Sequence, residues 1–202
     1  MPISAESTTT EIYNHLLNVI GSERFLKMQG LGNEIPFFIC SFDPAKTDGI
    51  YKEVITPLIN KLKHNGVKVL KVDLYDLSLE LLKSRGIWER TLETESEISK
   101  SELKDLLQSV LDVETHLIPA IGVKMNETDF DVLFLTGVGE VFPYIRSHTV
   151  LNNLQSTAKE KPTIMFFPGE YRQSAEKGSS LNLFGKLLDD NYYRAFDIYK
   201  HF

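Results

Sequence analysis

Short apolar runs alternate along this chain with segments whose apolar residues recur at the spacing of an α-helix. Continuous runs bounded by turn residues are typical of strands buried on both faces of a parallel sheet. The runs that we interpret as strands cover residues 35–42, 67–75, 132–136, 162–169 and 192–199. Because strands and helices alternate, we expect an α/β fold with three layers and a mostly parallel central sheet of about five strands. The strand at 35–42 should be interior, and 193–199 should lie at or near an edge.

The segments between these strands are expected to be mainly helical. Helical periodicity is found at residues 8–20, 49–64, 77–86, 87–114, 142–156 and 179–188. Pro57 should kink or restart the second of these helices, and Asp76 should cap the third. Pro143 is tolerated in the first turn of the helix at 142–156. The stretch 169–179, rich in Gly, Ser and charge, is interpreted as a mobile loop.

Composition limits the classes of protein to which the chain can belong. Its 202 residues fit a single domain, 1–202, with residues 1–29 as a helical segment packed on it. The net charge of −6 argues against direct nucleic-acid binding, which needs a basic face. Cys40 is the only cysteine, the N-terminus lacks signal-peptide features, and no run reaches the ~20 apolar residues of a membrane span. We therefore expect a cytoplasmic protein with no membrane contact.

The stretch "DVLFLTGVGEVFPYIRSH" at 131–148 places a Gly-x-Gly turn between a strand and a helix. Phosphate-binding loops use this arrangement, because backbone N–H groups and the positive end of the helix attract an anion. The P-loop motif is absent, however, and Phe142 stands where a Rossmann fingerprint has its third glycine. Glu140 at the expected helix start would repel phosphate. The sequence predicts a nucleotide-fold-like shape without a P-loop, with no cofactor and no tight ATP or GTP binding.

One acidic residue follows each of four predicted strands: Asp43, Asp73, Glu140 and Glu170. The carboxyl ends of parallel strands meet at one edge of a sheet, where ligands gather. Clustered carboxylates can hold Mg²⁺ for phosphoryl chemistry. An alternative function is therefore a Mg²⁺-dependent phosphohydrolase or nuclease. The competing interpretation is that each acid caps a turn or helix, which leaves no metal site and no catalytic residue.

Tyrosine and arginine side chains are the best candidates for contacts with a partner protein, because they dominate interface hot spots. Arg146 is expected on the polar side of its helix, and Tyr171 and Arg172 on the loop after the fourth strand. Tyr193 and Arg194 should lie near the sheet edge. Since the first three follow neighbouring strands, we expect them to share one surface.

Four segments resemble a known family when they are taken in order. They are "GLGNEIPFFI" (30–39), "FLTGVGEVFPYIRSHTVLNNLQ" (134–155), "FFPGEY" (166–171) and "SLNLFGKLLDDNYYRAF" (180–196). Together they closely resemble the BrxB proteins of bacterial BREX anti-phage systems. The resemblance spans nearly the whole chain from about Gly30, whereas residues 1–29 and 90–100 add no recognisable motif.

The resemblance implies membership of a multi-gene defence system that blocks phage replication and marks host DNA by methylation. No enzymatic activity is established for that family, and its sequence pattern assigns no catalytic residue. The resemblance therefore implies a small accessory protein, an adaptor that associates with larger BREX components, notably the phosphatase-like PglZ. We expect charge reversal at Arg146 or Arg172 to weaken that association.

Overall fold

The computed structural model describes residues 3–31, 36–174, 178–188 and 195–201. In its first half the elements are α1 (Thr9–Ile20), α2 (Glu23–Leu26), β1 (Phe37–Phe42), η1 (Pro44–Lys46), α3 (Thr47–Gly49), η2 (Ile50–Ile55), α4 (Thr56–His64), β2 (Val69–Asp73), α5 (Leu74–Ser84) and α6 (Trp88–Glu95). They continue as α7 (Lys100–Val110), η3 (Val113–Leu117), α8 (Ile118–Glu127), β3 (Val132–Thr136), α9 (Ser147–Leu154), β4 (Thr163–Ser174), β5 (Gly178–Leu183), β6 (Leu187–Leu188), β7 (Phe196–Asp197) and α10 (Ile198–His201).

A parallel sheet forms the centre of the molecule, with strand order β2-β3-β4-β1-β7. β1 is interior and β7 is at the edge, as the sequence predicted. β5 and β6 extend the far end of β4 as an antiparallel hairpin. The α/β fold class is therefore confirmed.

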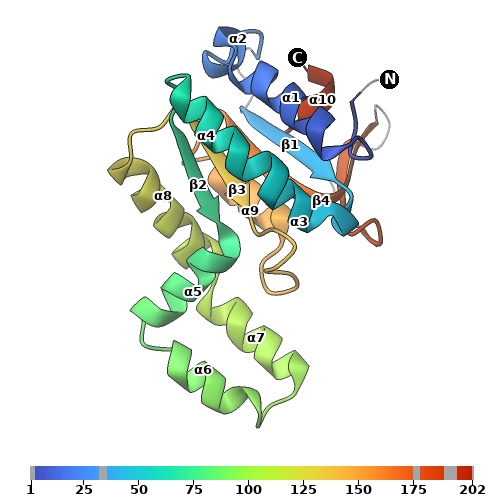
Figure 1. Cartoon of the computed structure of the whole chain (residues 1–202). Helices are drawn as coiled ribbons and strands as arrows, with labels where there is room; N and C mark the ends of the chain where they lie inside the picture. The colour runs from blue at the N-terminus through green and yellow to red at the C-terminus, as the bar shows by residue number, and fades with distance from the viewer. Residues whose placement is uncertain (1–2, 32–35, 175–177, 189–194, 202) are drawn as a thin grey trace.

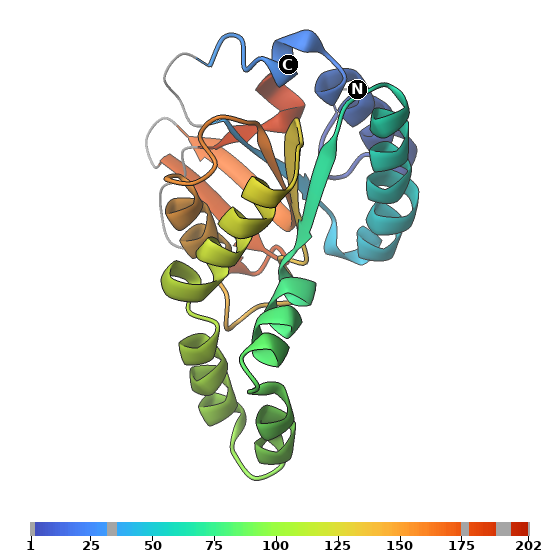
Figure 2. The ribbon, with the colours of Figure 1, turned by 90° about the vertical axis from the view of Figure 1, so that its left-hand side faces the viewer.

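Helices cover both faces of this sheet, because its strands are apolar on both sides. In β1, Phe37 and Ile39 pack with the cluster that includes η3, α8 and α9, whereas Phe38 and Cys40 pack with α1, η2 and α4. Figure 1 shows α1 and α4 across the near face, and Figure 2 shows α8 on the opposite side. Burial raises the pKa of the Cys40 thiol to about 12, so Cys40 acts as a small apolar residue.

The segment between β1 and β2 is one continuous helical stretch that changes its hydrogen-bond pattern. Residues 50–55 form a π-helix, in which the Thr56 N–H donates to the Tyr51 carbonyl. Pro57 follows directly and has no N–H to donate, so it interrupts the ladder of backbone hydrogen bonds where the π-helix gives way to α4. The helix thus restarts as α4 around Pro57, one of the two effects expected from this proline. Gly66, with φ +86°, ends the stretch.

Three expectations for the C-terminal half are wrong. The helix predicted from 142 begins only at Ser147, because residues 139–145 form turns that bury Val141 and Ile145. The predicted loop 169–179 is largely strand, since β4 continues to Ser174. The predicted helix 179–188 is the β5–β6 hairpin: Leu181 and Leu183 alternate with polar residues and are buried against the core.

Smaller corrections concern the helices between β2 and β3 and the end of the chain. Asp73, not Asp76, caps α5, accepting hydrogen bonds from the N–H groups of residues 75 and 76. The helical region 87–114 divides into α6 and α7 around a new capping residue, Ser99. Helix α8 was not predicted, and the last strand is confined to Phe196–Asp197 before α10 begins.

Candidate functional site

The Gly-x-Gly turn after β3 is held by the protein's own side chains. Gly137 has φ +74°, and its N–H donates to the Tyr51 hydroxyl at 2.7 Å. The Glu140 N–H closes the turn on the Gly137 carbonyl at 3.1 Å. A Cβ at position 137 would lie 2.5 Å from Asp73 Oδ1, so glycine is required here by close packing. Two of the N–H groups that a phosphate loop would present are thus already used.

Asp73 and Glu140 meet around Tyr51, a residue that the sequence did not single out. The Tyr51 hydroxyl lies 3.4 Å from Asp73 Oδ2 and 3.4 Å from Glu140 Oε1. Thr136 Oγ1 donates to the same Asp73 oxygen at 2.7 Å. Burial, followed by the charge of Asp73, raises the pKa of both Tyr51 and Glu140. The centre is negative and would repel an anion, although Glu140 lies in the turn before α9 and not at the helix start that the sequence predicted.

A pocket of about 180 Å³ lies beside this centre at the carboxyl ends of β1, β3 and β4. The connection after β1 covers one face of the sheet and α9, after β3, covers the other, so the pocket occupies the crevice between them. Its aromatic lining comes from Phe42, Phe166 and Phe184, and its polar lining from Tyr51 and Glu140. We call it the strand-end pocket.

The four strand-end carboxylates do not gather at one point. Asp43 caps η1 by accepting from the Ala45 N–H at 2.9 Å, and Glu170 pairs with Arg172 at 2.6 Å. Among the residues that the structure describes, no group of three or more His, Cys, Asp or Glu could hold a metal ion. The geometry therefore brings together Asp73 and Glu140 but not the set needed for a shared cation.

The predicted partner residues are separated rather than joined. Tyr171 is 6% exposed, and its hydroxyl donates to the Ala195 carbonyl at 2.5 Å, so it belongs to the core. Arg172, its exposed neighbour in the strand, lines a pocket with residues 3–6, and Tyr171 lines the same pocket. Exposed Arg146, immediately before α9, lines a cleft with Leu183 instead. Tyr193 and Arg194 lie outside the described residues.

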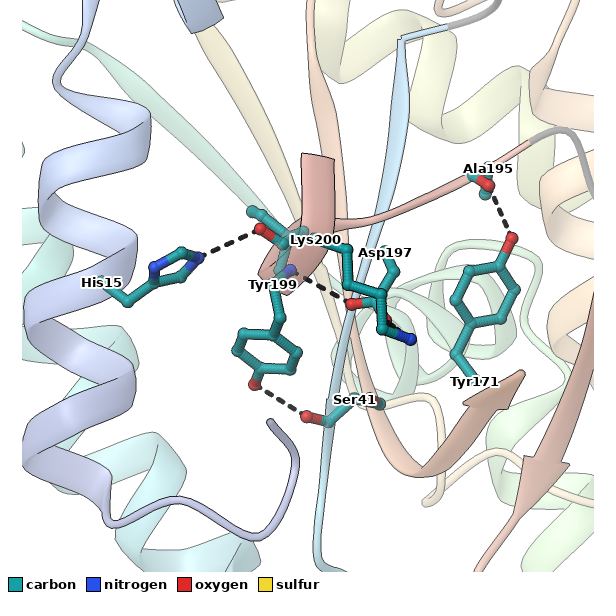
Figure 3. Close-up of polar contacts among 8 residues, drawn as sticks. His15, Ser41, Tyr171, Ala195, Asp197, Tyr199 and Lys200 are labelled. Carbon is teal, nitrogen blue, oxygen red and sulfur yellow. Dashed lines mark hydrogen bonds and ion pairs between the residues drawn. The ribbon is translucent and has the colours of Figure 1, made fainter. Parts of the chain in front are cut away.

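Polar contacts fix the C-terminal segment to the edge of the sheet (Figure 3). The Tyr199 hydroxyl donates to the Ser41 carbonyl at 2.8 Å, and Asp197 accepts from the Tyr199 N–H at 3.1 Å. His15 Nε2 lies 3.0 Å from the carbonyl of residue 198. These contacts join α1, β1 and α10, so these polar residues have a structural role.

Helices α6 and α7 project away from the sheet as a hairpin, residues 87–111, that we call the arm (Figures 1 and 2). No residue of α7 is buried, and Leu92 on α6 is 49% exposed. A groove of about 210 Å³ runs where the arm meets α5, and its lining is largely apolar: Tyr75, Leu79, Trp88, Leu92, Leu107 and Tyr144. The arm carries acidic residues Glu89, Glu93, Glu95, Glu97, Glu102 and Asp105 against basic Arg90, Lys100 and Lys104.

Comparison with known proteins identifies the family. The family model described as BREX protein BrxB matches residues 70–198. The chain belongs to the BrxB family. A BREX protein BrxB from Bacillus cereus (strain H3081.97) is 35% identical over 192 residues, covering 93% of this chain and 96% of the relative. Another, from Escherichia coli O9:H4 (strain HS), is 30% identical over 177 residues, covering 88% and 84%. No solved structure matches the chain.

BrxB membership confirms the resemblance read from the sequence and supports a role in phage defence as part of a BREX system. The matched range contains the arm, the Gly-x-Gly turn and the β4–β5 hairpin, but not Tyr51. Within the described part of the chain, no helix combines the length and the apolar character needed to cross a bilayer.

Proposed function

We propose that this BrxB-family chain is a non-catalytic accessory protein in the cytoplasm, which binds a larger BREX component such as the phosphatase-like PglZ. The observation that carries the proposal is the arm. Its helices are amphipathic, yet their apolar sides are left half-exposed beside a groove that lies away from the central sheet. Apolar surface of this kind, with a polar rim, is typical of sites that bind another protein.

The shape and charge of the groove suit a helix from the partner. An amphipathic helix binds such a groove by laying its apolar side chains along it. Trp88 and Leu92 from α6 and Leu107 from α7 would form the apolar contacts. Because acidic residues outnumber basic ones on the arm, the partner helix should carry lysine or arginine beside its apolar face.

The experiment is a pull-down from cells that carry the whole defence cluster. Leu92→Glu places a charge in the groove, and Val123→Glu on α8 is its matched control, since these side chains are 49% and 52% exposed. We expect Leu92→Glu to weaken capture of the partner by about 2 kcal/mol or more, the usual hot-spot threshold, and Val123→Glu to leave it unchanged. If the wild-type protein captures no BREX component, the accessory function is wrong. If Leu92→Glu captures normally, only the choice of the arm is wrong.

The alternative function, a Mg²⁺-dependent phosphohydrolase or nuclease, has one observation in its favour. Asp73 and Glu140 lie on either side of Tyr51 at the strand ends, where such chemistry is usually found. The assay is incubation of the purified chain with DNA and phosphoesters in the presence of Mg²⁺ or Mn²⁺. Turnover that is lost in Asp73→Asn would replace the accessory function with the enzymatic one.

A further inference from the structure

The strand-end pocket has aromatic walls that are held in place by tight packing. Phe184 adopts φ +56°, and its ring lies beside Gly139 of the Gly-x-Gly turn. A Cβ on Gly139 would lie 2.9 Å from Pro168 Cγ and 3.0 Å from Phe184 Cε1, so the turn and the ring are already in close contact. The Phe142 ring packs edge-on against the Phe184 ring, with the two ring centroids 6.5 Å apart. The pocket is therefore built into the fold by residues of β4, of the connection after β3 and of the turn between β5 and β6.

The charge beside this pocket is incompletely compensated. The Tyr51 hydroxyl accepts from the Gly137 N–H and has one proton, so it can donate to only one of the two carboxylates at a time. Asp73 has further donors, namely the Thr136 hydroxyl and the N–H groups at the start of α5. Within the described chain, Glu140 receives only the long hydrogen bond from Tyr51. The ammonium of Lys71 lies 5.9 Å from the Tyr51 ring centroid, and its charge offsets part of the rise in the pKa of Glu140.

We propose that the strand-end pocket binds a cationic group carried on an apolar stem, a guanidinium or an ammonium. The faces of aromatic rings attract cations, and the walls include Phe42, Phe166 and Phe184. Glu140 supplies the counter-charge and a hydrogen-bond acceptor at the rim. The same features exclude phosphate, although the position in the fold is the one at which related architectures bind nucleotides. This inference does not depend on the arm or on the accessory function.

The test is an NMR titration of the ¹⁵N-labelled chain, followed at the amides of residues 137–140. The probes are n-butylguanidinium and n-butylammonium, with neutral n-butylurea and anionic pentanoate as isosteric comparisons. We expect saturable shifts with both cations in the range of ~1–50 mM, as befits ligands of this size, and none with the other two. Glu140→Gln should weaken cation binding by about tenfold or more. Glu170→Gln, which removes a carboxylate paired with Arg172 elsewhere, is the matched control and should bind like wild type.

Three results would overturn the proposal: no saturable shift with either cation, equal binding of n-butylurea, or unchanged affinity in Glu140→Gln. The spectrum of each variant is compared with that of the wild-type protein to check that the fold is intact. Capture from cells then separates two sources of the same chemistry. If Glu140→Gln also lowers capture of a BREX component, the cation is a lysine or arginine side chain of the partner. If capture is unchanged while butylguanidinium binding is lost, the cation belongs to a free small molecule.

Discussion

Replacing Gly137 by alanine tests whether the Gly-x-Gly turn serves packing rather than phosphate binding. At φ +74° an alanine enters the left-handed region, which costs an L-residue about 1–2 kcal/mol. Its Cβ would also lie 2.5 Å from Asp73 Oδ1 and 3.0 Å from the backbone nitrogen of Tyr75. The backbone cannot give way easily, so the Asp73 carboxylate must move.

Moving that carboxylate breaks two contacts whose value can be estimated. The first is the N-cap of α5, typically worth ~1 kcal/mol, and the second is the hydrogen bond from Thr136, worth about the same. With the conformational cost, Gly137→Ala should lower the free energy of unfolding by about 3–4 kcal/mol. For a protein of this size each kcal/mol lowers the melting temperature by roughly 2–4 °C, so a fall of about 6–16 °C is expected.

Gly86→Ala is the matched control, because Gly86 has φ +66° and a Cβ there would meet nothing within 4 Å. It should suffer only the conformational cost of about 1–2 kcal/mol. Urea unfolding of both variants gives the two free energies directly, and the contact with Asp73 predicts a difference of about 2 kcal/mol between them. Equal destabilisation of the two variants, within ~0.5 kcal/mol, would refute the packing argument.

Three further predictions concern the same centre and the two arginines Arg146 and Arg172. Tyr51→Phe leaves the Gly137 N–H without its acceptor and should cost about 1–3 kcal/mol in urea unfolding, whereas exposed Tyr75→Phe should stay within ~0.5 kcal/mol of wild type. Because the pKa of Glu140 is raised from 4.5, the folded state binds that proton more tightly, and this group makes stability fall as pH rises from 4.5 through the raised pKa. Glu140→Gln should remove that fall, and an unchanged pH profile would contradict it. Since Arg146 and Arg172 line different pockets, no more than one of Arg146→Glu and Arg172→Glu should weaken partner capture by ~2 kcal/mol, with melting temperature near wild type.

Elements whose burial is decided locally were predictable from the sequence. The run that forms β3 is buried at every position, so its bounds, Val132–Thr136, follow from the apolar residues themselves. In α1 the apolar residues recur on one face and Thr8 and Glu11 form a capping box, so both the start and the packed side are specified within thirteen residues. The position of Glu140 beside Asp73 followed from the rule that parallel strands end at one edge.

Elements decided by distant partners were not predictable in the same way. Residues 179–188 contain leucines at spacings that fit a helix or a strand, and pairing with β4 selects the strand. That pairing also turns Tyr171 inward, since side chains alternate along β4. Tyr51 carried no local signal, because its hydroxyl bonds to the N–H of Gly137, which is 86 residues away in the sequence. For the helical stretch formed by η3 and α8 a signal existed: Val113, Leu117 and Ile121 recur every four residues and all three are buried.

One connection, residues 137–146, shapes both of the proposed binding surfaces. Glu140 lines the strand-end pocket, and Tyr144, four residues later, lines the groove beside the arm. The Tyr144 hydroxyl lies 3.4 Å from the Glu140 carbonyl oxygen, so the two walls belong to one packed turn. Gly137 anchors that turn to Tyr51 and Asp73 at its start. The pocket and the groove therefore take different residues from one connection of the backbone, Glu140 for the pocket and Tyr144 for the groove.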